Sequence, residues 1–372
     1  MRFWPDMPMM ASAKGYRFEP GKWHVVVVAK TRYVLKPGVC EELPGPMEAW
    51  VKAVQFSGDV PEADPAAGLT YPSDHSPSKT KADVLFDGSA HAPGGEPVAG
   101  LRCRFRVGPV DKSIDVVGDR VWGKSDETRG DIEPFTEMPI VWERAFGGPG
   151  DAKNPAGRGR RGEAMPNLEV VDKPVLTREA LTPPACLAPI NPAWKPRCDK
   201  LGSYGGDYVK KRFPWLPADF DWTHFDCAPE DQQVEGFLRG DEEIELRNLH
   251  KAHAELKTAL PGERLRAFLL ERLPDGGERF FEVKLVLDTV VVQPEEGEDG
   301  MVSVVWRGQE EGPSLKLEEI EHFMVIREPL GMADRGLSWF RKELDRRIEN
   351  PMEMFLDTET QETIDRVMAK AE

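Results

Sequence analysis

Long apolar runs are missing from this 372-residue chain. The longest candidate, residues 25–29, has the length of a strand, whereas a membrane-spanning helix needs about 18 apolar residues. The first ten residues are interrupted by Pro5, Asp6 and Pro8 and do not resemble a secretory signal. We therefore expect a cytoplasmic protein without membrane insertion.

Cysteine is scarce, and the five residues present form no CxxC pair. An odd, scattered set fits neither a disulfide framework nor a zinc ribbon, so reduced and buried thiols are expected. These residues are Cys40, Cys103, Cys186, Cys198 and Cys227.

Basic charge is in deficit, with 49 Lys and Arg against 65 Asp and Glu and a net charge of −16. This balance argues against a nucleic-acid partner, because phosphate binding depends on clustered cations. The deficit is uneven: residues 293–322 hold nine acidic and two basic side chains, whereas residues 151–215 hold twelve basic and seven acidic ones. Separated charge of both signs favours binding to another protein.

Signatures of catalysis and of cofactor binding are also absent. There is no GxSxG, GxxxxGK[ST] or GxGxxG motif, and the glycines of residues 146–159 are better explained by positive φ or close backbone approach. His250 and His253 form an HxxH pair without a third ligand nearby in the sequence. No metal, cofactor or catalytic residue is predicted.

What the chain does contain is strand patterning. Leu101, Cys103, Phe105 and Val107 alternate with arginines, which predicts a half-buried strand with residues 113–122 as its hairpin partner. Further strands are predicted at residues 23–35, 82–86, 243–249, 264–273, 280–293 and 301–308, the last group forming a meander. We predict a mainly β fold with β-sandwich-like antiparallel sheets.

Residues 136–236 differ from the rest, since thirteen prolines forbid long helices and central strands there. Because the segment also carries ten large aromatics, we expect an ordered, irregular wrap over a sheet. Leu337, Phe340, Leu344 and Ile348 predict a C-terminal helix, and a second one is expected over residues 358–370. The expected divisions are 1–135 (β), 136–236 (the wrap), 237–330 (β meander) and 331–372 (helical extension), with 1–330 as one composite domain.

Five carboxylates gather between aromatic rings in residues 217–233. Paired carboxylates in this setting suit glycoside hydrolysis or sugar binding, although Asp is also common as a former of turns. Both interpretations stay open from the sequence alone. The residues are Asp219, Asp221, Asp226, Glu230 and Asp231.

Eleven short phrases follow one another along residues 22–325 in an order that resembles one bacterial family, domain of unknown function 2169 (DUF2169). They are KTKADV (79–84), VGDRVW (117–122), ERAFGGP (143–149), NPAG (154–157), MPNLE (165–169), APEDQ (228–232), GDE (240–242), NLH (248–250), LPG (260–262), LDTV (287–290) and VWRG (305–308).

The resemblance implies a role in type VI secretion. Similar proteins are regarded as non-enzymatic adaptors or chaperones that hold a toxin, for example by its PAAR-containing or N-terminal segment, and help to load it onto the VgrG spike. The alternatives are a carbohydrate-active enzyme or sugar-binding module that uses residues 219–231, and a structural component of the secretion apparatus.

Candidate partner-binding surfaces are the aromatic part of the wrap (residues 194–225), its basic loop at residues 158–161, the C-terminal helix and the shared phrases. Glycine, proline and asparagine in these phrases have backbone roles as well, and the tryptophans also suit packing. The residues proposed for partner contact are Arg144, Phe146, Arg158, Arg160, Arg161, Trp194, Trp215, Trp222, Asp231 and Gln232.

Overall fold

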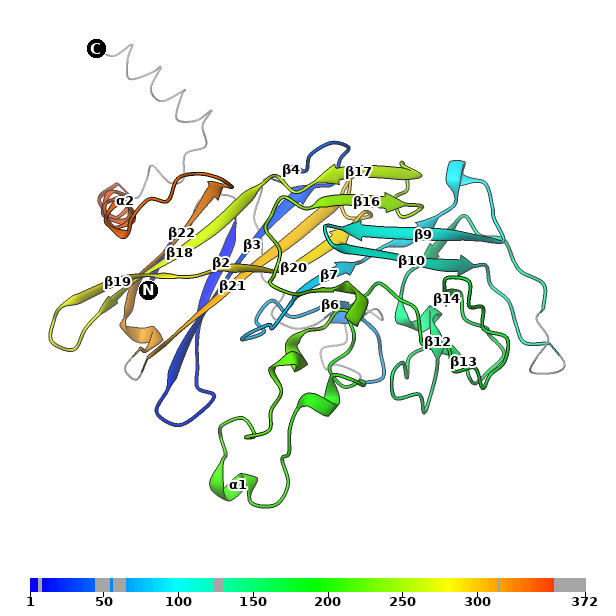
Figure 1. The fold of residues 1–372 in the computed structure, drawn as a ribbon, viewed down its shortest axis with the longest axis horizontal. Coiled ribbons are helices and arrows are strands. Elements are labelled where there is room, and N and C mark those ends of the chain that lie inside the picture. Colours follow the sequence, from blue (N-terminus) through cyan, green and yellow to red (C-terminus); the bar gives the residue numbers. More distant parts are fainter. Residues whose placement is uncertain (6–8, 44–53, 56–64, 124–129, 313–314, 351–372) are drawn as a thin grey trace, which may run out of the picture.

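A computed structural model describes residues 1–5, 9–43, 54–55, 65–123, 130–312 and 315–350, and its fold is mainly β (Figure 1). The predicted fold class is confirmed. The division of the chain into four parts stays a prediction.

A seven-stranded sheet forms the centre of the molecule. In spatial order it contains β15 (Gln233–Val234), β7 (Ala82–Phe86), β20 (Val286–Gln293), β21 (Met301–Gly312), β3 (Trp23–Val34) and β2 (Met10–Tyr16), and β4 (Glu41–Glu42) pairs with β3. β7 and β20 run parallel, whereas β20, β21 and β3 are antiparallel.

Two further sheets lie at opposite ends of this central sheet (Figure 1). One contains β1 (Arg2–Pro5), β22 (Ile320–Pro329), β18 (Glu263–Arg272) and β19 (Glu278–Val283); the other contains β14 (Leu168–Val170), β10 (Val110–Val117), β9 (Gly100–Val107), β16 (Glu243–Arg247) and β17 (Glu255–Ala259). The smaller pairs are β8 (Ser89–His91) with β11 (Glu137–Pro139), β12 (Phe146–Gly147) with β13 (Arg158–Gly159), and β5 (Val54–Gln55) with β6 (Leu69–Tyr71).

The hairpin predicted from the alternation of apolar residues with arginines is present as β9 and β10. Its turn is shorter than expected, because Val110 already pairs with Val107. Cys103, Phe105 and Val107 are buried, as the alternation predicts.

The expected single strand over residues 280–293 is wrong. The chain leaves one sheet after β19 and enters another at β20, where Val286 pairs with Arg307. Gly308 lies at this crossing, where a Cβ would overlap the carbonyl oxygen of Lys284. The apolar pattern is continuous on both sides of the break, so the meander is divided between two sheets by tertiary packing.

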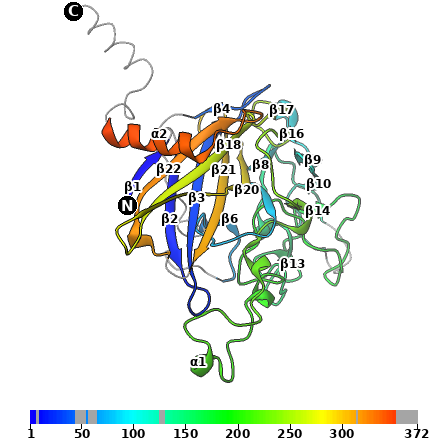
Figure 2. The same ribbon diagram turned by 60° about the vertical axis from the view of Figure 1, so that its left-hand side comes forward.

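One large apolar core joins the sheets and the wrap. Its buried members run from Met9 to Val325 and include Trp142, Cys186 and Trp194 of the wrap. The wrap is therefore ordered and anchored, as expected. Only its α1 (Tyr208–Lys211) and the chain around it project away from the sheets (Figures 1 and 2).

The predicted C-terminal helix is present as α2 (Leu337–Glu349), and the expected helix at residues 358–370 lies outside the described residues. α2 lies across β22 and β18 (Figure 2) and also contacts β19. Phe340 and Leu344 pack there with Trp4, Phe268 and other residues in a separate apolar cluster. The helix thus covers a face of the sheet that is distinct from the main core.

Replacing Phe340 by Ala tests this docking. The Phe340 ring is fully buried and stacks on Phe268 with centroids 4.1 Å apart, so the substitution should lower the free energy of unfolding by about 3–5 kcal/mol. Urea unfolding followed by circular dichroism measures the change. Trp339→Ala is the control, since Trp339 is 38 % exposed and its contact with Arg335 contributes only about 1 kcal/mol. Equal effects of both substitutions would contradict the packing described.

Candidate partner-binding site

A fully buried ion pair connects the central sheet to the wrap. Lys79 Nζ lies 2.6 Å from Asp83 Oδ2 on β7 and donates to Thr289 Oγ1 of β20 at 2.7 Å. Burial alone would lower the pKa of Lys79 and raise that of Asp83, but their mutual attraction reverses both shifts, so the pKa of Lys79 is raised and that of Asp83 is lowered. Both groups are held in their charged forms.

Asp83 also fixes the backbone that follows the aromatic part of the wrap. Its carboxylate oxygens accept hydrogen bonds from the N–H groups of Cys227 at 2.9 Å and Ala228 at 3.0 Å. These residues immediately precede Pro229 and the short 3-10 turn Glu230–Gln232. The ion pair thereby positions the shared phrase of residues 228–232.

Gln232 ties the same turn to two other segments. Its Nε2 donates to the carbonyl oxygens of Val84 and Leu187 at 2.8 and 2.9 Å, and its Oε1 accepts from Lys112 Nζ at 2.9 Å. Lys112 also contacts Asp231 at 2.8 Å. Gln232 is buried, whereas Asp231 is exposed, so only Asp231 of this predicted pair faces solvent.

Two cavities adjoin at this turn, because they share Pro183, Pro184, Pro229 and Glu230 as lining residues. Together we call them the wrap groove. The first has a volume of about 480 Å³ and also contacts Lys112, Ser113, Ile114 and Asp231. The second has a volume of about 610 Å³, which is within the range of ligand sites. The second cavity is also lined by Lys81, Trp142, Lys153, Ile190, Lys195, Pro196, Arg197, Asp199, Lys200 and Asp226.

The arginines predicted for partner contact do not line this groove. Arg144 and Arg158 both donate to Asn167 Oδ1, at 3.1 and 3.2 Å. Arg160 pairs with Asp151 at 2.6 Å and stacks over the Phe146 ring at 4.5 Å. These contacts hold the glycine-rich loop to its surroundings, which is a structural role.

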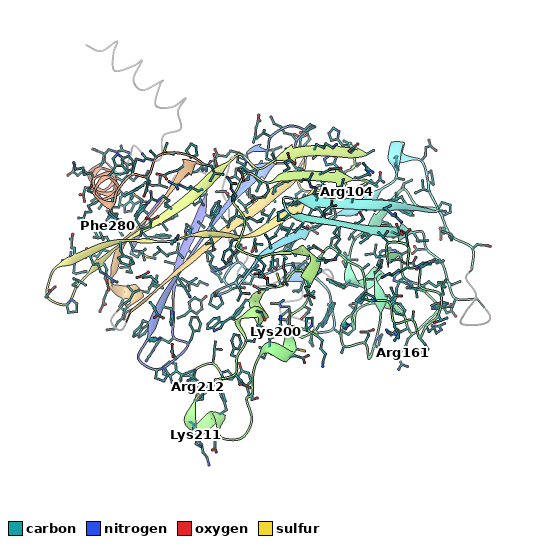
Figure 3. All side chains as sticks on the ribbon, viewed as in Figure 1. Arg104, Arg161, Lys200, Lys211, Arg212 and Phe280 are labelled. Carbon is teal, nitrogen blue, oxygen red and sulfur yellow. The ribbon has the colours of Figure 1, made fainter. Side chains whose placement is uncertain are left out.

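Arg161 is the most exposed of the predicted arginines, and its Nε donates to the carbonyl oxygen of Pro149 at 3.2 Å. In Figure 3 it lies on a different part of the molecule from Lys200, which lines the groove. Arg161 is therefore available to a partner without belonging to the groove.

The predicted aromatic contacts are packing residues in this fold. Trp194 is buried, donates its Nε1–H to the carbonyl oxygen of Pro65 at 2.7 Å and meets Trp142 edge to face. Phe146 is likewise buried. Trp215 and Trp222 are half-buried and contact Arg17 and Phe18 of the N-terminal hairpin, with centroid distances of 4.7 and 4.9 Å.

The carboxylates that suggested hydrolysis are engaged in loop structure. Asp219 accepts hydrogen bonds from Ser203 N and Oγ. Asp221 is the N-cap of the 3-10 helix Trp222–Phe225, and its side chain accepts a hydrogen bond from Thr223 N. Asp226 accepts from Thr80 N and Oγ1. Asp226 and Glu230 nevertheless line the same cavity.

The HxxH pair lies near the acidic turn after β20. His250 Nδ1 accepts the N–H groups of Ala252 and His253 at 3.1 and 3.2 Å, and its Nε2 faces the carbonyl oxygen of Asp299. Both ring nitrogens are thus occupied. Within the described part of the chain, no group of three or more metal-ligating side chains gathers.

The cations of the groove were not singled out from the sequence. They come from three segments, with Lys81 in the first, Lys153 in the second, and Lys195, Arg197 and Lys200 in the third. The excess of basic residues in 151–215 was the signal for the last four, whereas Lys81 belongs to the shared phrase at 79–84. Which of those residues share a cavity is decided by the fold.

Residues 20–307 match the family described as an uncharacterized protein conserved in bacteria, domain of unknown function 2169. The chain belongs to this family of bacterial proteins, as the shared phrases indicated. No curated protein and no solved structure matches it. In the ranges that the structure describes, no helix is long and apolar enough to span a membrane.

Replacing Lys79 by Met tests the buried pair that positions the groove. Removing one partner leaves Asp83 charged and buried, which should cost about 3–5 kcal/mol of unfolding free energy. Urea unfolding measures the loss. Lys81→Met is the control, because the Lys81–Glu235 pair is solvent-exposed and surface pairs contribute little. A stable Lys79→Met protein would contradict the role assigned to the pair.

The raised pKa of Asp87, the residue that follows β7, should make the free energy of unfolding depend on pH. Burial, with nearby Glu296 adding to it, raises the pKa of Asp87 to about 6, although its carboxylate accepts from Tyr71 Oη at 2.6 Å. Because this folded-state pKa lies above the unfolded value of about 3.9, the stabilisation of the fold by protonated Asp87 is complete below about pH 4. It is lost as the pH rises through about 6.

Asp87→Asn should therefore stabilise the protein at pH 7.5 relative to its effect at pH 4.5, by about 2–3 kcal/mol. Thermal or urea unfolding of both proteins at the two pH values measures the difference. A pH-independent difference between them would show that Asp87 ionises normally in the folded state.

Proposed function

We propose that this protein is a cytoplasmic, non-enzymatic adaptor or chaperone that binds a type VI secretion toxin and assists its loading onto the VgrG and PAAR spike. The supporting observation is the wrap groove, a pair of adjoining cavities with proline walls and a cationic rim on a protein of net charge −16. Membership of the family supports the secretion context through the resemblance stated above.

The groove suits an extended segment of a protein partner. Pro183, Pro184 and Pro229 offer apolar surface without N–H donors, while lysines and carboxylates on the rim offer polar contacts. Because these walls are anchored by Asp83 and Gln232, the groove is pre-formed, which lowers the entropic cost of binding. A toxin segment held here would be kept from aggregating before transfer.

A sugar-active enzyme is the second candidate, and Asp226 and Glu230 in one cavity with Trp142 are the observation in its favour. The Asp226 carboxylate is already bound by Thr80, and Trp142 directs its Nε1–H to the carbonyl oxygens of Ala188 and Pro189. The adaptor proposal uses the groove without requiring either group to be released.

Filling the groove tests the adaptor proposal. Ser113 on β10 lines the first cavity, so Ser113→Trp should reduce the amount of neighbouring toxin that co-purifies on co-expression by about fivefold or more, because a bulky ring occupies the space of the segment. Quantified pull-down with the toxin and its fragments is the measurement.

Lys257→Trp on β17 is the control, since it adds the same ring at an exposed position on the edge strand of the same sheet, outside the groove. It should leave co-purification unchanged, and thermal unfolding should show both variants folded. Equal recovery of toxin with both folded variants would count against the groove as the toxin site.

A further inference from the structure

Arg197 differs from the other buried cations of this protein. It is only 7 % exposed and lines the second cavity of the wrap groove. Among the described residues it forms no ion pair with a carboxylate; its Nε donates to the carbonyl oxygen of His224 at 2.9 Å and its Nη1 to that of Ile190. Its hydrogen-bond partners are therefore neutral carbonyls, and the carboxylates of Asp83 and Asp226 attract its charge only from beyond ion-pair distance.

In the ranges that the structure describes, each of the other buried Lys and Arg residues has a carboxylate within 3.2 Å. The pairs are Lys30–Asp74, Lys79–Asp83, Arg120–Glu169, Arg307–Asp288 and Arg347–Glu343. The fold thus neutralises its buried cations as a rule, and Arg197 is the exception at a cavity.

A buried guanidinium without an anion is energetically costly. Burial holds the pKa of Arg197 below its usual value, but arginine stays charged at neutral pH. Because transfer of a charge out of water is compensated mainly by a partner of opposite charge, an anion in the cavity would offset a cost that the fold already bears.

The rest of the cavity reinforces this preference. Five cationic side chains line it against three carboxylates, Asp199, Asp226 and Glu230, which leaves 5 − 3 = +2. Asp199 is paired with Lys195 at 3.3 Å, and Asp226 with Thr80. Lys153 is exposed and has no ion pair among the described residues. This cavity is therefore locally positive, although the whole protein is acidic.

The size and walls of the cavity favour a peptide over a bare ion. A volume of about 610 Å³ exceeds what one phosphate fills, and Trp142, Ile190 and the prolines provide apolar contact beside the cations. Arginine also suits carboxylates, because its planar N–H groups match their two oxygens.

We propose that the cavity around Arg197 binds a carboxylate of an acidic, partly apolar peptide segment, with Arg197 as its buried counter-charge and Lys153, Lys195 and Lys200 at the rim. This deepens the adaptor proposal, on which it rests for the identity of the partner, by assigning the chemistry of the segment. The binding chemistry is testable with the purified protein alone.

The test uses fluorescein-labelled peptides and fluorescence anisotropy at two salt concentrations. The probe is Gly-Glu-Leu-Glu-Val-Glu-Leu-Glu-Gly, and its counterpart carries Gln at every Glu. The acidic peptide should bind at least about tenfold more tightly than its Gln counterpart, and the difference should shrink at high salt. Inorganic phosphate at matched ionic strength serves as the competing small anion.

Two variants locate the binding. Arg197→Met should weaken the acidic peptide by about tenfold to hundredfold. Because Arg197 also holds two backbone carbonyls, the double variant Lys153→Glu/Lys195→Glu provides an independent test with exposed side chains, and it should weaken binding about tenfold. Lys210→Glu/Lys211→Glu makes the same charge change on α1, which does not line the cavity, and should have little effect; Figure 3 shows Lys211 apart from Lys200 of the cavity.

Equal affinity for the acidic and Gln peptides would overturn the proposal, as would equal weakening by the two double variants. Full displacement of the acidic peptide by millimolar phosphate would also overturn it, since the cavity would then be a site for small anions. If these results were negative while Ser113→Trp still reduced toxin recovery as expected, the adaptor function would stand and only the acidic nature of the segment would be wrong.

Discussion

The buried attraction between Lys79 and Asp83 is the interaction on which the arrangement of this protein depends. Lys79, just before β7, contacts Asp83 on β7 at 2.6 Å and Thr289 on the parallel neighbour β20 at 2.7 Å. The Asp83 carboxylate also accepts hydrogen bonds from the backbone N–H groups of Cys227 and Ala228. One carboxylate therefore balances a buried cation and fixes the point where the wrap returns to the sheet.

Several of the phrases that carry the family resemblance converge on this region. Residues 79–84 supply the ion pair, residues 228–232 supply the turn that it holds, and Thr289 comes from the phrase at 287–290. Nearby, Arg307 from the phrase at 305–308 binds Asp288 at 2.6 Å. These residues have a physical reason to occur together, because removing one member leaves a buried charge or donor unsatisfied.

Anchoring side chains hold the wrap in order against the sheets, and the wrap groove is its candidate functional site. Trp142, Trp194 and Gln232 fix irregular chain against the sheets, and the prolines beside them form the walls of a groove. The predicted interpretation of the tryptophans as packing residues fits their geometry, whereas Arg144, Arg158 and Arg160 serve the glycine-rich loop. The cations with access to a cavity are different ones, and Arg197 among them is buried without a carboxylate.

Local patterns in the sequence determined the mainly β class, the hairpin of β9 and β10, the ordered wrap and α2, because alternation, turn residues and helical spacing act over a few neighbouring residues. The break between β19 and β20 carries no such pattern. Every second position across it is apolar (Phe281, Val283, Leu285 and Leu287), and Gly308, at the crossing, is distant in sequence. Only the tertiary structure decided that Lys81, Lys153, Lys195, Arg197 and Lys200 share one cavity. Charge pairing acts through space, so which cation keeps a carboxylate and which faces an open cavity follows from long-range packing.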